Sequence, residues 1–268
     1  MPPAEPQFVT VGHGADCRRI ATLVNGGPQR TGAGLVWLPG FKSEMTSTKA
    51  SALADWATAH RKPMTRLDYS GHGQSPGRVE DGSISRWLAE VRHVFETVTQ
   101  GPQIVIGSSM GGYLALLLLR ALMRDAPTEA TRIKALILVA PAWDMTERLM
   151  TPRLTAEARR QLAEAGVYLR PSAYGDGPYP ITRHLLEDGR RHLIGTTPFD
   201  PGRPVQILHG LQDPDVPWEH TLDLVAHLDG DWTHVHAVPE GDHRLSRPED
   251  IELLLRVVSE ASEATDGA

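Results

Sequence analysis

The length, composition and charge of the chain bound what it can be. Its 268 residues are 40% hydrophobic and 22% charged, which suits a single domain over residues 1–268 that carries an insertion. The net charge of -6 comes from 33 acidic and 27 basic residues, with no long basic run. This balance gives no electrostatic reason to expect nucleic-acid binding, so a small neutral or weakly charged substrate is expected.

Cysteine usage and apolar run length bear on the compartment. The single cysteine, Cys17, cannot form an internal disulfide, which fits a reducing compartment. Met1–Thr10 has no basic segment followed by an apolar one, and the longest apolar candidate, Tyr113–Leu119, ends at Arg120. That run is far shorter than the ~18 apolar residues that span a bilayer. We therefore expect a cytoplasmic protein without membrane insertion.

Short apolar runs alternate with amphipathic segments in the first part of the chain. Strands are predicted at Ile20–Val24, Gly34–Leu38 and Thr65–Tyr69, and a helix near Thr46–His60. Ser83–Thr99 repeats apolar residues at the spacing of a helix with one buried face. This alternation is typical of an α/β protein whose parallel strands are joined by crossover helices.

The alternation continues after residue 100, with one interruption. Further strands are predicted at Gln103–Ile106, Ile133–Val139, Val205–Leu208 and Thr233–Val238, and further helices at Met110–Met123, Thr221–Leu228 and from about Pro248. In residues 145–200 the rhythm breaks, with helix signals at Thr155–Ala165 and Ile181–Leu193 around the Pro- and Gly-rich loop Pro171–Pro180. An insertion of this length predicts a small helical lid over a site at the carboxyl ends of the strands.

Two segments, Gly107–Gly111 and Gly73–Gly77, match the G-x-S-x-G pattern of a nucleophile elbow. An elbow turns sharply from a buried strand into a helix, and its small residues let two backbones approach. Ser109 has this context, whereas Ser75 lies in a predicted loop and precedes a proline that lacks the N–H needed for an oxyanion. Ser109 is therefore the candidate nucleophile, unless the glycines merely form a tight turn. The motif predicts an α/β-hydrolase fold with a mostly parallel central sheet flanked by helices.

An oxyanion hole needs two backbone donors. The first is the N–H of Met110, the residue after the candidate nucleophile. The second is expected in the loop after the third strand, where Gly40 lets the backbone bend so that the Phe41 N–H can face Met110. Losing one such donor typically costs roughly 10²- to 10³-fold in rate. The alternative is that this loop is an ordinary strand-ending turn.

A serine hydroxyl needs a neutral imidazole to take its proton, and the imidazole needs a carboxylate to orient it. In this fold the chain order is serine, acid, histidine. The turn His209–Pro217 follows a predicted strand and carries both Asp213 and Asp215. Asp213 is favoured because it lies earlier in the turn, whereas Asp215 lies nearer a helix start at Pro217. Asp144 is a weaker third candidate.

Five histidines follow the candidate acid, namely His220, His227, His234, His236 and His243. The first two fall in a predicted helix and the next two in a predicted strand, where a satisfied or exposed side chain is the simpler interpretation. His243 follows the last strand in a loop, where it can reach Ser109, so it is the candidate base. His234 and His236 share one strand face but have no third ligand nearby, so no metal is expected. The pair Gly26-Gly27 has neither Walker nor dinucleotide spacing, and we expect no cofactor.

Five segments together resemble a known family: Leu38–Phe41, Asp68–Gly71, Gly107–Gly112, His209–Trp218 and Asp242–Arg244. With the stretch Tyr179–Leu193, they are similar to the family of alpha/beta-hydrolase domain-containing protein ten and its bacterial relatives, over about Trp37–Ile251. The resemblance implies cleavage of esters or thioesters, because the family acts on S-palmitoylated protein cysteines and on acyl glucuronides. It also implies catalytic roles for Ser109, Asp213 and His243.

The expected chemistry is acyl transfer to Ser109 and then to water, with a small ester, a thioester or an acylated protein as substrate. Apolar residues of the lid and rim are candidates to hold an acyl or aromatic group in a dry pocket, although each could equally be core. They are Met110, Trp143, Met145, Leu149, Tyr179 and Trp218.

Other functions are compatible with the same residues. A lyase or a cofactor-free haloperoxidase can use a similar triad, and hydrolysis of a short nitrophenyl ester compared with those activities would rank them. A dehalogenase is disfavoured because its nucleophile is a carboxylate. A ligand-binding receptor could retain the fold with a vestigial triad, in which case a fluorophosphonate would leave the protein unlabelled.

Overall fold

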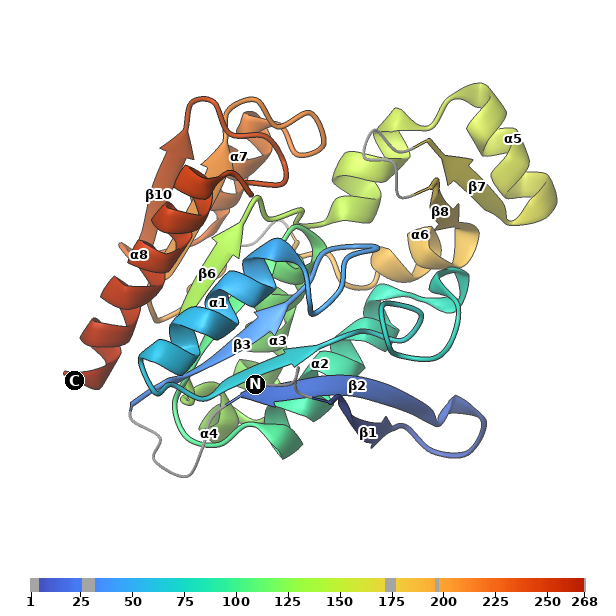
Figure 1. Cartoon of the computed structure of the whole chain (residues 1–268). Coiled ribbons are helices and arrows are strands. Elements are labelled where there is room, and N and C mark those ends of the chain that lie inside the picture. The colour runs from blue at the N-terminus through green and yellow to red at the C-terminus, as the bar shows by residue number, and fades with distance from the viewer. Residues whose placement is uncertain (1–4, 26–31, 172–176, 196–197, 268) are drawn as a thin grey trace.

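The computed structural model describes residues 5–25, 32–171, 177–195 and 198–267, and one eight-stranded sheet forms its centre (Figure 1). The strand order is β1-β2-β4-β3-β5-β6-β9-β10. All pairs from β4 to β10 are parallel, while β1 and β2 are added antiparallel at one edge. The strands are β1 Gln7–Val11, β2 Arg18–Asn25, β3 Gly34–Leu38, β4 Met64–Leu67, β5 Gln103–Ser108, β6 Ile133–Val139, β9 Val205–Gly210 and β10 Thr233–Val238. The predicted α/β-hydrolase fold with a mostly parallel sheet is confirmed.

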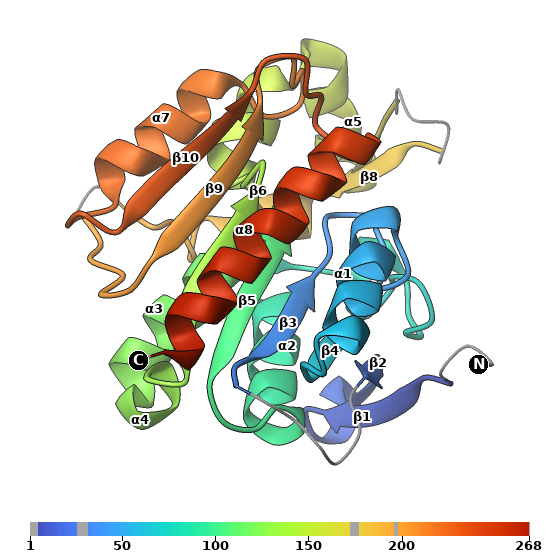
Figure 2. The same cartoon turned by 60° about the vertical axis from the view of Figure 1, so that its left-hand side comes forward.

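Helices cover both faces of this sheet. They are α1 Thr48–Ala59, α2 Ile84–Val98, α3 Met110–Asp125, α4 Pro127–Ala130, α7 Trp218–His227 and α8 Pro248–Asp266. Side chains of β3 alternate between two cores, so that Leu35 and Trp37 pack with α1 and α8, while Val36 and Leu38 pack with α2 and α3. Figure 2 shows α1 and α8 in front of the sheet, with α2 and α3 behind it. The crossover helices expected from the sequence therefore close both faces.

The segment between β6 and β9 forms a separate group of elements beside the sheet (Figure 1). It contains a π-helical turn Thr146–Met150, a 3-10 turn Thr151–Arg153, the helix α5 Ala156–Ala165, the strands β7 Val167–Arg170 and β8 Tyr179–Thr182, and the helix α6 Arg183–Gly189. β7 and β8 pair antiparallel, so the predicted helix Ile181–Leu193 is wrong at its start, where the chain is still a strand. Residues 172–176 of the predicted loop lie outside the described residues. We call residues 145–200 the insertion.

Polar contacts fasten the insertion to α2 and α3. The carboxylate of Asp188 accepts hydrogen bonds from the N–H and the hydroxyl of Ser85, at 2.7 and 2.6 Å. The Tyr113 hydroxyl donates to the carbonyl of His192 at 2.8 Å. Asp144, the third candidate acid, is buried and accepts from the N–H of Ile194 at 2.9 Å. Its carboxylate therefore helps to hold the insertion, since a buried acceptor needs such a partner.

Candidate active site

Ser109 occupies a strained turn between β5 and α3. Its φ of 54° and ψ of -116° lie in a region that a residue with a side chain rarely adopts. The Ser109 N–H donates to Val139 O at 2.8 Å, and the Ser109 carbonyl accepts from the N–H groups of Gly112 and Ala142 at 3.0 and 3.1 Å. These backbone hydrogen bonds hold the strained residue in place. A strained turn of this kind is what a nucleophile elbow requires.

The two glycines of the motif are needed for space. A Cβ on Gly107 would lie well under 3.0 Å from the Gly111 carbonyl oxygen, and a Cβ on Gly111 would lie equally close to Leu38 O. Both clashes are with backbone, so no rotation of a side chain can relieve them. The spacing of G-x-S-x-G thus follows from the close packing of α3 onto the ends of β3 and β5.

Gly111→Ala is expected to lower the free energy of unfolding by about 3 kcal/mol or more, because the new methyl group must push two backbone segments apart. Gly112→Ala is the matched control. There the added Cβ would lie 3.1 Å from a Pro141 side-chain carbon, so a loss of about 1 kcal/mol is expected. Urea unfolding of both variants measures the difference, and equal losses would contradict the steric explanation.

The second G-x-S-x-G serine has a different role. Ser75 is buried in the loop after β4, where its hydroxyl donates to Asp68 O at 2.6 Å and accepts from the Ala21 N–H at 2.8 Å. Both hydrogen-bonding functions of this hydroxyl are therefore used inside the protein. Ser75 holds its loop against β2, in agreement with its interpretation as a loop residue.

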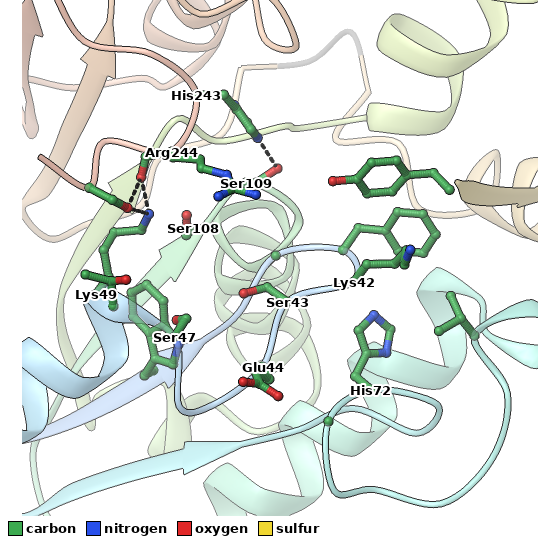
Figure 3. Close-up of a pocket in the computed structure, with 18 of the residues that line it drawn as sticks. Lys42, Ser43, Glu44, Ser47, Lys49, His72, Ser108, Ser109, His243 and Arg244 are labelled. Carbon is green, nitrogen blue, oxygen red and sulfur yellow. Dashed lines mark hydrogen bonds between the residues drawn. The ribbon is translucent and has the colours of Figure 1, made fainter. Parts of the chain in front are cut away.

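The structure brings Ser109, His243 and Asp213 into one hydrogen-bonded chain. His243 Nε2 lies 3.1 Å from Ser109 Oγ, and His243 Nδ1 lies 2.7 Å from Asp213 Oδ2. Figure 3 shows the imidazole and the hydroxyl facing each other across the top of the cleft. With its proton on Nδ1, the imidazole donates to the carboxylate and leaves Nε2 free to accept the proton of the serine. These separations lie within the reach required for general-base activation of a hydroxyl.

The two aspartates in the turn after β9 have different partners. The Asp213 side chain is 0% exposed, and its Oδ1 accepts from the N–H groups of Asp215 and Val216 at 2.8 and 2.9 Å. The other oxygen is thereby aimed at His243. The carboxylate of Asp215 instead lies 3.7 Å from the guanidinium of Arg170 and is 28% exposed. Asp213 is therefore the aspartate that orients the imidazole in this structure.

The loop that carries His243 is held from two sides. Within the loop, Asp242 Oδ1 accepts from the N–H groups of Arg244 and Leu245, both at 3.0 Å. From α1, the ammonium of Lys49 donates to Arg244 O and to Ser246 Oγ. Burial lowers the pKa of Lys49 to about 8, because water no longer solvates its charge. The contact from α1 links the first crossover helix to the position of the imidazole.

The loop after β3 lies against the serine. A Cβ on Gly40 would be only 3.4 Å from Ser109 Cβ, so the bare backbone at Gly40 passes beside the Ser109 side chain. Phe41 follows it, and Met110 begins α3. Among the described residues, neither the Phe41 N–H nor the Met110 N–H donates to a backbone acceptor. Both groups thus have hydrogen-bonding capacity left for a ligand.

Two cavities open beside Ser109 and His243, and Phe41 and Tyr179 line both. The larger has a volume of about 670 Å³, and we call it the polar cleft (Figure 3). Its polar lining includes Ser43, Glu44, Ser47, Lys49, Arg244 and Ser246. The smaller has a volume of about 70 Å³, and we call it the apolar cavity. Its apolar lining includes Ala142, Met145, Leu149, Met150 and Val216.

A family model described as serine aminopeptidase, S33, matches residues 30–186. The chain belongs to this family. It is 30% identical over 230 residues to palmitoyl-protein thioesterase ABHD10, mitochondrial, of Bos taurus, covering 85% of this chain and 72% of the relative. The resemblance predicted from the sequence is confirmed, and the protein is a hydrolase.

Solved structures show the same relationship. A protein from Agrobacterium vitis S4 superposes with a TM-score of 0.93 at 41% identity, covering 97% of this chain and 99% of that one. Mouse alpha/beta hydrolase domain-containing protein 10 superposes with a TM-score of 0.80 at 27% identity, covering 96% of this chain and 98% of that one. The mammalian relatives carry the word mitochondrial in their names, and the cytoplasmic location expected for this S33-family hydrolase stays a prediction.

The predicted pocket residues of this hydrolase divide into two groups. Met145, Leu149 and Tyr179 line the apolar cavity, as their place in the insertion predicted. Trp143 does not line it, because its indole N–H donates to His220 O at 2.9 Å and its ring packs on α7. Trp218 begins α7 and packs against the His209 ring, with ring centroids 5.5 Å apart. Met110 lines neither cavity, since the start of α3 buries it completely.

Three further residues that line the apolar cavity were not predicted from the sequence. Ala142, Met150 and Val216 belong to it but have no functional signature. Only their positions in the chain could have indicated them: Ala142 follows the end of β6, and Val216 follows the candidate acid in the same turn. The carboxyl ends of parallel strands meet at one edge of a sheet, so both positions were open to inference.

Four other histidines follow Asp213 in the chain, and none of them lines either cavity. His220 and His227 are in α7, and His234 and His236 are in β10, where His236 Nε2 pairs with Gln206 Oε1 at 2.9 Å. Over residues 5–25, 32–171, 177–195 and 198–267, no three His, Cys, Asp or Glu side chains form a group that could hold a metal ion. In that same part of the chain, no helix has the length and apolar character needed to cross a bilayer.

Two buried histidines are expected to make the stability of the hydrolase depend on pH. Burial lowers the pKa of His72 and of His220 from 6.5 to about 4. Between pH 6.5 and about 4 the unfolded chain binds protons that the folded chain does not, so the free energy of unfolding falls as the pH falls. Each histidine contributes a loss of about 3 kcal/mol at pH 4.

Urea unfolding at pH 7 and pH 4.5 measures this loss in the wild type and in His72→Gln. The variant is expected to lose less stability on acidification, because glutamine does not titrate. Equal pH dependence of the two proteins would contradict the assignment of a neutral buried imidazole at position 72.

Proposed function

We propose that this hydrolase cleaves carboxylic esters or thioesters through an acyl-enzyme on Ser109. The observation that carries the proposal is the hydrogen-bonded chain Ser109–His243–Asp213 at the junction of two cavities. The name of the bovine relative, a palmitoyl-protein thioesterase, supports thioester cleavage in particular. The natural substrate is then a small ester, a thioester or an acylated protein.

In the first half of the reaction, His243 Nε2 takes the proton of the Ser109 hydroxyl while Oγ attacks the carbonyl carbon of the substrate. The carbonyl oxygen becomes an oxyanion, which the N–H groups of Phe41 and Met110 stabilise. Collapse of this intermediate breaks the bond to the leaving alcohol or thiol, which receives the proton from His243. Asp213 keeps the imidazole in the productive tautomer and stabilises its positive charge.

In the second half, a water molecule replaces the leaving group. His243 takes one of its protons, and the remaining hydroxide attacks the acyl carbon of the ester on Ser109. The second oxyanion collapses, the carboxylic acid leaves, and the proton returns to Ser109 Oγ. The enzyme is regenerated without a cofactor, because every proton and electron pair is supplied by these groups and water.

Rapid mixing of the enzyme with a nitrophenyl ester and with an acyl thioester tests the proposal. We expect a burst of nitrophenol or thiol that is stoichiometric with enzyme, or steady turnover if deacylation is fast. An enzyme that turns over neither substrate, yet performs a lyase or haloperoxidase reaction, would contradict it. A protein that binds such molecules without turnover would instead be a receptor with a vestigial triad.

A further inference from the structure

The two cavities beside Ser109 differ in size and character, and this difference bears on which part of the substrate each one holds. Both touch Ser109 and His243, so the two groups joined at the scissile carbonyl can lie one in each. The stacked rings of Phe41 and Tyr179, with centroids 5.8 Å apart, line both cavities. An inference about this division rests on the proposed acyl-enzyme at Ser109.

The apolar cavity has the lining that an acyl chain needs. Ala142, Met145 and Val216 are 4, 3 and 2% exposed, so water has little access to these residues. Leu149 and Met150 come from the π-helical turn of the insertion and are also buried. Transfer of a methylene group from water to such a surface is favourable by about 0.8 kcal/mol.

The size of the apolar cavity limits the length of that chain. Its free volume is about 70 Å³. A cavity of about 150 Å³ holds one benzene ring, so this volume corresponds to roughly three carbon groups of an acyl chain. The palmitoyl chain named for the mammalian relatives is much longer.

Three charged residues also line the apolar cavity, namely Arg153, Arg170 and Asp215. The guanidinium of Arg170 lies 3.7 Å from the Asp215 carboxylate and 5.0 Å from the centroid of the Tyr179 ring. A long apolar chain would have to displace water from these charges, which is costly without compensating hydrogen bonds.

The polar cleft is suited to the other half of the substrate. Its volume of about 670 Å³ has room for a bulky group, and hydroxyls, Glu44, Lys49 and Arg244 line it (Figure 3). A long hydrocarbon would gain little there, since the ammonium of Lys49 and the carboxylate of Glu44 favour water or a polar ligand. A polar alcohol or thiol can exchange that water for hydrogen bonds.

We infer that this enzyme is selective for short acyl groups, of about four carbons, joined to a bulky polar alcohol or thiol. The acyl group lies in the apolar cavity, and the leaving group lies in the polar cleft. The side chains that set the acyl length are Leu149, Met145 and Ala142.

A series of acyl thioesters with one polar thiol, from acetyl through butyryl, hexanoyl and dodecanoyl to palmitoyl, tests the inference below micelle-forming concentrations. We expect kcat/KM to be highest for butyryl or hexanoyl and at least about tenfold lower for palmitoyl, which corresponds to the loss of about 1.4 kcal/mol of transition-state binding. A wild-type maximum at dodecanoyl or palmitoyl would overturn the inference while leaving the acyl-enzyme intact. No turnover at any length would overturn the proposed function itself.

Two cavity variants make the assignment residue-specific. Leu149→Ala enlarges the cavity, and the kcat/KM ratio of dodecanoyl to butyryl is expected to rise at least about fivefold. Ala142→Val fills the cavity, and the ratio of hexanoyl to acetyl is expected to fall by a similar factor. Leu222→Ala, at a 46% exposed position of α7, is the matched control and should leave both ratios unchanged. If the profiles of the first two variants coincide with that of the control, acyl length is not set in the apolar cavity.

Discussion

Ser109→Ala is expected to lower kcat for ester and thioester hydrolysis by about 10⁴- to 10⁶-fold. The variant lacks the oxygen that forms the acyl bond, so any remaining rate comes from water attacking a substrate held by the oxyanion donors. The substitution removes one oxygen atom of a half-buried side chain and keeps the Cβ, so the elbow should remain folded. Steady-state kinetics on a nitrophenyl ester measures the effect, with thermal unfolding as a check of the fold.

Ser75→Ala is the matched control for that experiment, because it sits in the same sequence pattern. Its hydroxyl bonds to Asp68 O and to the Ala21 N–H, so its loss is expected to cost about 1–3 kcal/mol of stability. The kcat of this variant should stay within about threefold of the wild type. Loss of turnover in Ser75→Ala, or full turnover in Ser109→Ala, would contradict these roles for the two serines.

Asp213→Asn is expected to lower kcat by about 10⁴-fold, the second largest effect. The asparagine amide is nearly the same size as the carboxylate, but it cannot stabilise an imidazolium and can donate a hydrogen bond to His243 Nδ1. The imidazole would then carry its proton on Nε2, and that nitrogen could no longer accept the proton of the Ser109 hydroxyl. Because the Val216 and Asp215 N–H groups still find an oxygen at position 213, the turn should persist.

Asp215→Asn changes the neighbouring carboxylate in the same turn. Its side chain faces Arg170 rather than His243, so a loss of less than about tenfold is expected. Comparing kcat for the two variants at pH 7 separates the aspartates. A larger loss in Asp215→Asn than in Asp213→Asn would show that the acid has been assigned to the wrong residue.

Most of the sheet could be predicted because parallel strands are buried on both faces and therefore read as short continuous apolar runs. β1 was missed because it is an edge strand with mostly exposed residues and carries no such run. The hairpin of β7 and β8 was missed for a related reason. Tyr179–Thr182 is too short to show a strand period, and it passes directly into α6, whose helical spacing dominated the pattern.

Site residues could be predicted from the sequence where their chemistry requires particular neighbouring residues in the chain. The elbow needs glycine on either side of Ser109 for steric reasons that the structure shows at Gly107 and Gly111. The pocket wall has no such requirement. Trp143 and Met145 are equally apolar and two positions apart, yet one packs under α7 and the other lines the cavity. Side-chain direction decides between them, and it depends on the local turn rather than on composition.

The choice between Asp213 and Asp215 depended on turn geometry that a sequence only suggests. In the structure the decisive feature is that Asp213 Oδ1 accepts two backbone N–H groups, which fixes the other oxygen toward His243. An aspartate that bonds to the backbone two and three residues later is a common turn former. The same local preference that closes the turn after β9 therefore also aims the carboxylate.

Covalent labelling by a fluorophosphonate tests whether Ser109 is an activated nucleophile, since the reagent reacts with a serine only when its hydroxyl is activated. We expect one adduct per chain, located by peptide mass spectrometry on Ser109, and no adduct in His243→Ala. Ser108 also lines the polar cleft. An unlabelled folded protein, or an adduct on Ser108 in place of Ser109, would contradict the assignment of Ser109 as the nucleophile.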